Sequence, residues 1–174
     1  MTVNGAQAGF RIVVGADDAG VDYKNVLAER LRADLRVAAV IDVGIQQGEH
    51  TSYPEIATAA AQCIARGEAD RGLLICGTGL GMAIAANKTP GIRAATAHDP
   101  YSVARSVLSN DAQVLTMGQR VIGLELAKTL VDIWLGVQFD ESSPSAAKVA
   151  IISRMERQLW RVPECEQEAN PRPA

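Results

Sequence analysis

The stretch LLICGTGLGMAIAANK, residues 73–88, decides the fold, because an apolar run passes through three closely spaced glycines into an Ala-rich segment. This order predicts a buried strand over Arg71–Cys76, a tight turn, and a helix that ends near Asn87. Backbone N–H groups in such a turn can approach a ligand closely, although a turn without any ligand is the alternative. The dinucleotide fingerprint needs a G-x-G-x-x-G spacing after the first strand, so the G-x-G-x-G spacing here argues against a nicotinamide cofactor.

Short apolar runs and helical patterns alternate along the rest of the chain. Further strands are expected at Phe10–Gly15, Val37–Val43, Ile92–Thr96 and Val114–Met117. Further helices are expected at Val21–Leu35, Tyr53–Gly67, Tyr101–Leu108, Gly123–Leu135 and Ala146–Trp160. This alternation predicts βαβ units, and therefore an α/β protein whose parallel sheet is covered on both faces.

The length and composition fit a single domain over residues 9–160, followed by a polar tail, residues 161–174, that is expected to be disordered. The 174 residues are 48% hydrophobic and carry a net charge of −3, which excludes a broad basic field for nucleic acid or an anionic membrane. A local group of Arg side chains can still bind one phosphate. The chain has no long apolar run and only three irregularly spaced cysteines, so a cytoplasmic location without disulfides is expected.

Polar or Gly-rich turns follow three of the expected strands: Asp17–Asp18, Cys76–Gly81 and His98–Asp99. The carboxyl ends of parallel strands meet at one edge of a sheet, where ligands bind, so these turns are expected to lie close together. His50 stands in a polar loop and is expected to be solvated.

Each candidate residue has a functional and a structural interpretation. Cys76 at a strand end is available as a base or nucleophile, or it is a small buried apolar residue. One of Asp17 and Asp18 can cap a helix, which leaves the other to bind a hydroxyl or hold a proton. His98 can be catalytic or structural, and Arg120 can hold an anion or form a surface ion pair.

The sequence resembles the ribose-5-phosphate isomerase B family, which includes the galactose-6-phosphate isomerase subunits. The resemblance rests on CGTGLGMAIAANKTPGIRAATAHDPYS from residue 76 and on SNDAQVLTMGQRVIGLELAKTLVDIWL from residue 109. The G-x-D-x-A-G turn at Gly15–Gly20 and the Tyr53-Pro54 pair also fit, so the match spans residues 11–157. The resemblance implies a Rossmann-like three-layer αβα sandwich with a five-stranded parallel sheet, in a homodimer or tetramer whose active sites lie at the subunit interface.

The same resemblance implies an aldose–ketose isomerase of a sugar phosphate that works through a cis-enediolate without a metal or other cofactor. Cys76 matches the residue that moves the proton between C1 and C2, and Thr78 matches the hydroxyl that shuttles protons between the sugar oxygens. Asp17 and His98 complete the expected catalytic set. The expected substrate-binding residues are Asp18, Tyr53, Gly77, Gly79, Gly81, Asn110, Arg120 and Lys148, with the amides of the three glycines stabilising the enediolate oxygen and Arg120 supplied to the phosphate by a neighbouring subunit.

The chain departs from the family pattern at three places. Asp18 stands where most members have His, and Ser109 stands where they have the His assigned to opening the sugar ring. The family's Gly-Gly-Arg-His-x-x-Arg pattern reads SSPSAAK over residues 142–148, so Lys148 replaces one phosphate-binding Arg as a point charge and the other is absent.

The loss of the ring-opening residue bears on the substrate. Erythrose 4-phosphate cannot close a furanose ring because its C4 oxygen carries the phosphate. We therefore expect a tetrose phosphate, erythrulose 4-phosphate or erythrose 4-phosphate, with ribose 5-phosphate as the alternative if His98 opens the ring. A subunit of a hetero-oligomeric isomerase and a non-catalytic sugar-phosphate-binding protein are further alternatives.

Overall fold

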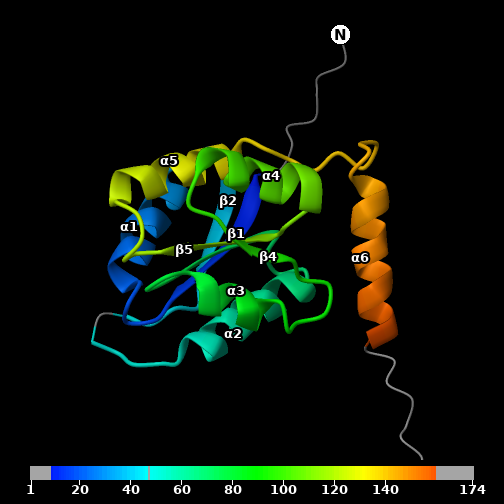
Figure 1. Ribbon diagram of the computed structural model, residues 1–174. Coiled ribbons are helices and arrows are strands. Elements are labelled where there is room, and N and C mark those ends of the chain that lie inside the picture. The colour runs from blue at the N-terminus through cyan, green and yellow to red at the C-terminus, as the bar shows by residue number, and fades with distance from the viewer. Residues whose placement is uncertain (1–8, 47, 160–174) are drawn as a thin grey trace, which may run out of the picture.

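The computed structural model describes residues 9–46 and 48–159, and within them the chain forms five strands and six helices (Figure 1). The strands are β1 (Phe10–Ala16), β2 (Val37–Asp42), β3 (Arg71–Cys76), β4 (Ala94–Thr96) and β5 (Val114–Gly118). The helices are α1 (Val21–Arg32), α2 (Tyr53–Ala65), α3 (Leu80–Ala86), α4 (Pro100–Asn110), α5 (Leu124–Leu135) and α6 (Ala146–Leu159). Trp160 and the expected tail, residues 161–174, lie outside the described residues.

The strands form one parallel sheet in the order β2-β1-β3-β5-β4, which confirms the expected five-stranded sheet. At its carboxyl edge Ala16 pairs with Ile75 and Cys76 pairs with Gly118. The chain reverses its direction across the sheet between β1 and β3, and in open α/β sheets ligands bind in the crevice at this point. Asp17 and Cys76 lie on the two sides of that crevice.

Helices cover both faces of the sheet, so the three-layer sandwich is also confirmed. Helices α1, α4 and α5 lie on one face, where Leu27 and Trp134 belong to the larger core, and α2 and α3 lie on the other, where Ile56 and Met82 belong to the second core (Figure 1). Every residue of β3 is buried, as expected for a central strand covered on both sides. No described helix is both long enough and apolar enough to cross a membrane.

The last helix, α6, stands beside this sandwich rather than within it (Figure 1). Val149 is its one buried residue among those the structure describes, and the Glu156 carboxylate ties the helix to the body by accepting a hydrogen bond from the Gly91 N–H at 2.9 Å. Four large apolar side chains of α6 are exposed: Ile151, Ile152, Met155 and Leu159.

One expectation about the first helix is wrong. The spacing of apolar residues predicted a helix to Leu35, whereas α1 ends at Arg32 and Leu35 is fully exposed. Asp34 forms a turn instead, since its carbonyl accepts from Val37 N–H at 3.0 Å and its carboxylate accepts from Arg36 N–H at 2.8 Å. The Arg36 guanidinium also lowers the pKa of Asp34 to about 2. The turn leads directly into β2, whose first residue, Val37, pairs with Phe10.

A buried ion pair fixes the loop that follows β2. The Lys24 side chain has no exposed surface, and its Nζ donates to Asp42 Oδ2 at 2.8 Å and to the Ile45 carbonyl at 3.0 Å. The second Asp42 oxygen accepts from the Gly44 N–H at 2.9 Å. One cation, the Lys24 ammonium, therefore holds together helix α1, the end of β2 and the start of the next loop.

Replacing Lys24 with Met should destabilise the protein by about 3 kcal/mol, because it leaves the Asp42 carboxylate without its cation in a largely buried site. Urea denaturation measures the change in free energy of unfolding. Arg32→Met is the matched control, because Arg32 also lies on α1 but its ion pair with Glu29 is exposed; its loss should cost less than about 1 kcal/mol. Equal effects of the two substitutions would contradict the assigned role of Lys24.

Candidate active site

The carboxyl edge of the sheet gathers the three turns that the sequence singled out. Asp17 follows β1, Cys76 ends β3, and His98 follows β4. Gly118 ends β5, and its N–H donates a hydrogen bond to His98 Nε2. The expectation that these turns lie close together is confirmed.

Cys76 is buried at the end of β3, and its Sγ accepts a hydrogen bond from the Gly79 N–H at 3.1 Å. The turn can form this bond because Gly79 has φ +81°, a conformation that favours glycine. A Cβ at Gly79 would also lie 2.9 Å from the Met117 carbonyl carbon. The thiol therefore faces a turn of closely packed backbone, with one amide already directed at the sulfur.

Packing also accounts for Gly81. A Cβ there would lie 2.5 Å from Tyr53 Cε2, so the glycine makes room for the tyrosine ring at the start of α2. Tyr53 and the Cys76 turn are thus in direct contact. Thr78, an exposed residue of the same turn, accepts a hydrogen bond from the Leu80 N–H at 3.4 Å through its hydroxyl.

Asp17 is a largely buried carboxylate. Its Oδ1 accepts from the Ala19 N–H at 3.1 Å. Burial raises the pKa of Asp17, while the same backbone hydrogen bond and the positive charge of Arg120 oppose the rise. Asp18, in contrast, is exposed, and its Oδ2 lies 3.7 Å from His50 Nδ1.

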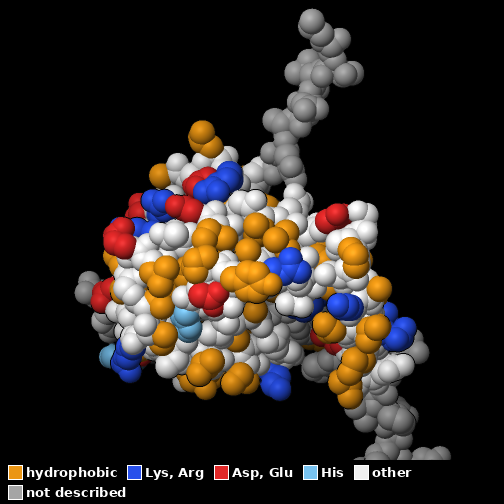
Figure 2. Space-filling view, turned by 45° about the horizontal axis from the view of Figure 1, so that its top comes forward, with side chains coloured by type: hydrophobic (Ala, Val, Ile, Leu, Met, Phe, Trp, Pro, Cys, Tyr) orange, Lys and Arg blue, Asp and Glu red, His pale blue; other side chains and the backbone are white. Residues whose placement is uncertain are grey.

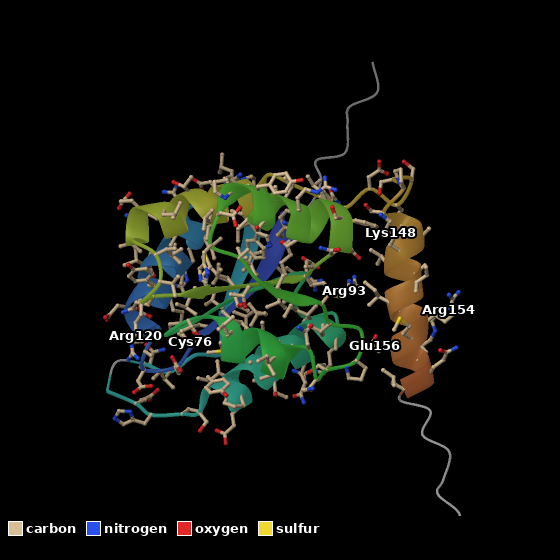
Figure 3. All side chains as sticks on the ribbon, viewed as in Figure 1. Cys76, Arg93, Arg120, Lys148, Arg154 and Glu156 are labelled. Atoms are coloured by element: carbon tan, nitrogen blue, oxygen red, sulfur yellow. The ribbon has the colours of Figure 1, made fainter. Side chains whose placement is uncertain are left out.

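Arg120 lies in the site of its own chain. Its N–H donates to the Gly77 carbonyl at 3.1 Å, and a Cβ at Gly77 would lie 3.6 Å from Arg120 Nη1. Within the single chain, the pairing of Cys76 with Gly118 places Arg120 beside the Cys76 turn. That Arg120 binds the phosphate of a neighbouring subunit, as the resemblance implied, stays a prediction. Figure 3 shows Arg120 and Cys76 on the same side of the molecule.

His98 is half-buried, and its Nε2 accepts a hydrogen bond from the Gly118 N–H at 2.9 Å. Since a backbone N–H can only donate, the neutral ring must carry its proton on Nδ1. Burial lowers the pKa of His98, and nearby Asp99 opposes this only in part. The side chain thus links the β4–α4 turn to the end of β5.

Two of the expected substrate-binding residues lie away from Cys76 in the fold. Asn110 ends α4, which runs back across the sheet, and its carbonyl accepts from Arg93 Nε at 3.0 Å near the amino edge. Lys148 belongs to α6, on the opposite side of the molecule from Cys76 (Figure 3). The chain therefore does not bring these two residues to its own Cys76.

An open cleft of about 340 Å³ adjoins the site. It is lined by Asp17, Asp18, His50, Thr51, Ser52 and Tyr53. His50 is highly exposed, as expected, but its place beside the site was not predicted from the sequence. The available signal was its position three residues before Tyr53, in a loop that follows a strand end. Among the described residues no group of three His, Cys, Asp or Glu side chains is arranged to hold a metal ion.

The fold and its carboxyl-edge site are those of a class of sugar isomerases. The sequence model for ribose/galactose isomerases matches residues 12–152, and the chain belongs to that family. D-erythrulose-4-phosphate isomerase 2 of Mycolicibacterium smegmatis is 65% identical over 141 residues, which are 80% of this chain and 93% of that protein. Ribose-5-phosphate isomerase B of Escherichia coli is 47% identical over 130 residues, 75% of this chain and 86% of that protein.

Solved structures agree with the sequence comparison. Ribose-5-phosphate isomerase B of Clostridium thermocellum superposes with a TM-score of 0.81 at 40% identity, covering 86% of this chain and 99% of that one. The resemblance stated from the sequence is thereby confirmed. The protein is an enzyme, an aldose–ketose isomerase of this family.

The His98 geometry predicts a pKa below the usual 6.5 and a proton on Nδ1 in the neutral ring. Because the pKa of His98 is lower in the folded than in the unfolded protein, its titration should not change the free energy of unfolding above about pH 6.5. That free energy should fall as the pH is lowered through about 6.5 toward the pKa in the folded protein. Long-range ¹H–¹⁵N spectra of the imidazoles report both quantities, and His98→Gln assigns the signal against that of His50. A neutral ring protonated on Nε2 would contradict the hydrogen bond to Gly118.

Proposed function

We propose that this isomerase interconverts the aldose and ketose forms of a small sugar phosphate through a cis-enediolate, with Cys76 as the base. The observation that carries the proposal is the position of Cys76 Sγ at the crevice between β1 and β3, against a turn of backbone amides. A thiolate beside amide donors suits removal of a proton next to a carbonyl, because the amides stabilise the oxygen that gains negative charge.

The proton transfers balance without any further reactant. From the ketose, the Cys76 thiolate takes a proton from C1, and the C1–C2 double bond forms as the C2 carbonyl becomes an enediolate oxygen. Thr78 passes the O1 proton to O2, and the Cys76 thiol then returns its proton to C2, which leaves the C1 aldehyde. Since the Gly79 N–H already donates to Sγ, we assign stabilisation of the enediolate oxygen to the amides of Gly77 and Gly81.

A tetrose phosphate, erythrulose 4-phosphate with erythrose 4-phosphate, is the proposed substrate pair. The name of the relative at 65% identity supports this choice. Two features of the chain support it independently. Ser109 stands at the position of the family's ring-opening His, and the Nε2 of His98 already accepts from Gly118, so His98 cannot take a proton there without losing that bond. Ribose 5-phosphate remains the second candidate, supported by the relative at 47% identity.

We infer that a second copy of the chain completes the site. Arg120 supplies one positive charge to the phosphate within its own chain, whereas Asn110 and Lys148 can contribute only to a neighbouring subunit. Figure 2 shows apolar side chains along α6 and on the adjoining body, and an exposed apolar area of this kind suits a subunit interface. A related chain could fill the same place, as the hetero-oligomeric alternative requires.

The proposal is tested by assaying the purified protein on erythrulose 4-phosphate and ribose 5-phosphate. We expect a higher kcat/KM for the tetrose, and Cys76→Ser should lower kcat at least about 100-fold because the stronger base is lost. Wild-type protein in D₂O should also exchange the C1 proton. Cys63→Ser is the control, because that thiol is buried within α2; it should retain activity. A higher kcat/KM for ribose 5-phosphate would overturn the tetrose assignment, and full activity of Cys76→Ser would overturn the mechanism.

Complementation between two inactive variants tests whether each active site is formed by two subunits. Cys76→Ala and Asn110→Ala should each be inactive, and co-refolding them in equal amounts should restore about a quarter of the wild-type activity, because half of the dimers are mixed and each mixed dimer has one intact site. No recovery on mixing would mean that Asn110 does not act across an interface. Activity that appears only with a second, related chain would favour the hetero-oligomer.

A further inference from the structure

The chain has two histidines, and they differ in their contacts near the site. His98 has Nε2 engaged with the Gly118 N–H. His50 lines the open cleft beside Asp17, and its Nδ1 lies 3.7 Å from Asp18 Oδ2. His50 is therefore the imidazole of this chain that has a carboxylate partner and a side chain on the cleft.

The loop that carries His50 is anchored at both ends. At its start Ile45 N–H donates to the Ala16 carbonyl at 3.2 Å, while the Ile45 carbonyl accepts from the buried Lys24 ammonium at 3.0 Å. At its end the chain enters α2 at Tyr53, whose ring packs against Gly81. His50 thus extends from a supported loop toward the first turn of the site.

An imidazole whose Nδ1 lies 3.7 Å from a carboxylate can serve as a general acid when it is protonated. When Nδ1 faces Asp18, Nε2 is directed away from the carboxylate and is available for proton transfer to a ligand in the cleft. Asp17 lines the same cleft as a second carboxylate. Burial raises the pKa of Asp17, which makes it a better proton acceptor than an ordinary aspartate. The cleft therefore holds an acid and a base outside the Cys76 turn.

We propose that His50, oriented by Asp18, and Asp17 open the furanose ring of a pentose phosphate before isomerisation. The protonated His50 gives its Nε2 proton to the ring oxygen O4 as the C1–O4 bond breaks. Asp17 takes the proton of the anomeric hydroxyl, and C1–O1 becomes the aldehyde. Water then carries the proton from Asp17 back to His50, so no other reactant is needed. This inference rests on the proposed isomerase function. It concerns the second candidate substrate, a pentose phosphate, and assigns ring opening to residues other than Ser109 and His98, while the tetrose needs no such step.

Ring opening can be measured without isomerisation in a Cys76→Ser background. Magnetisation transfer between the two anomers of [1-¹³C]ribose 5-phosphate gives the exchange rate, and Cys76→Ser should raise that rate above the rate in buffer. Adding His50→Gln should reduce this acceleration at least about tenfold, because glutamine keeps a polar side chain but cannot transfer the proton. Asp18→Asn should produce a smaller loss in the same direction.

Glu49→Gln is the matched control. Glu49 lies next to His50, and its carboxylate accepts from the Gln46 N–H at 2.8 Å, so the substitution disturbs the loop while keeping the imidazole. It should leave the exchange rate nearly unchanged. An equal loss in Glu49→Gln, undiminished exchange in His50→Gln, or no acceleration by Cys76→Ser would each overturn the inference. Failure of the proposed function is a separate result, namely that the wild-type protein isomerises no sugar phosphate.

Discussion

The close contact between two backbone turns is the constraint on which the rest of the site depends. The turn after β3 and the turn after β5 meet so tightly that a Cβ at Gly118 would lie 2.6 Å from Thr78 Cα, and one at Gly79 would lie 2.9 Å from the Met117 carbonyl carbon. The Gln119 and Arg120 N–H groups donate to the carbonyls of residues 76 and 77. This contact orients the thiol, directs an amide at it, and brings a guanidinium beside it.

The direction of the chain divides the functional residues into two groups. Residues that directly follow parallel strands lie at the carboxyl edge, and this places Asp17, Cys76 and His98 together. Each crossover helix then returns the chain to the amino edge, so Asn110 at the end of α4 lies far from the thiol of its own chain. The proposed site, which includes residues of both groups, therefore forms only when two chains associate. We therefore regard the exposed apolar surface of α6 as functionally related to the site.

Charge at the cleft is distributed between carboxylates and cations. Asp17 and Asp18 would repel an anionic substrate if they stood alone, but Arg120 acts on Asp17 and His50 faces Asp18. The buried Lys24 balances Asp42 below the loop that carries His50. Asp17 and Asp42 therefore each have a cationic neighbour, while Asp18 faces an imidazole. Nearby cations offset part of the negative charge that an anionic ligand meets at this edge.

The sequence by itself determined the number, order and type of the elements, because apolar runs and helical spacings are local patterns, and it identified the turns at Asp17, Cys76 and His98. It misplaced Leu35, since α1 ends at Arg32 and a hydrogen-bonded turn at Asp34 follows, which leaves Leu35 exposed. Only the tertiary structure decided that Arg120 lies beside the Cys76 turn, that Asn110 lies at the opposite edge of the sheet, and that His50 faces Asp18. These facts depend on pairing between segments far apart in the sequence, which no local pattern records.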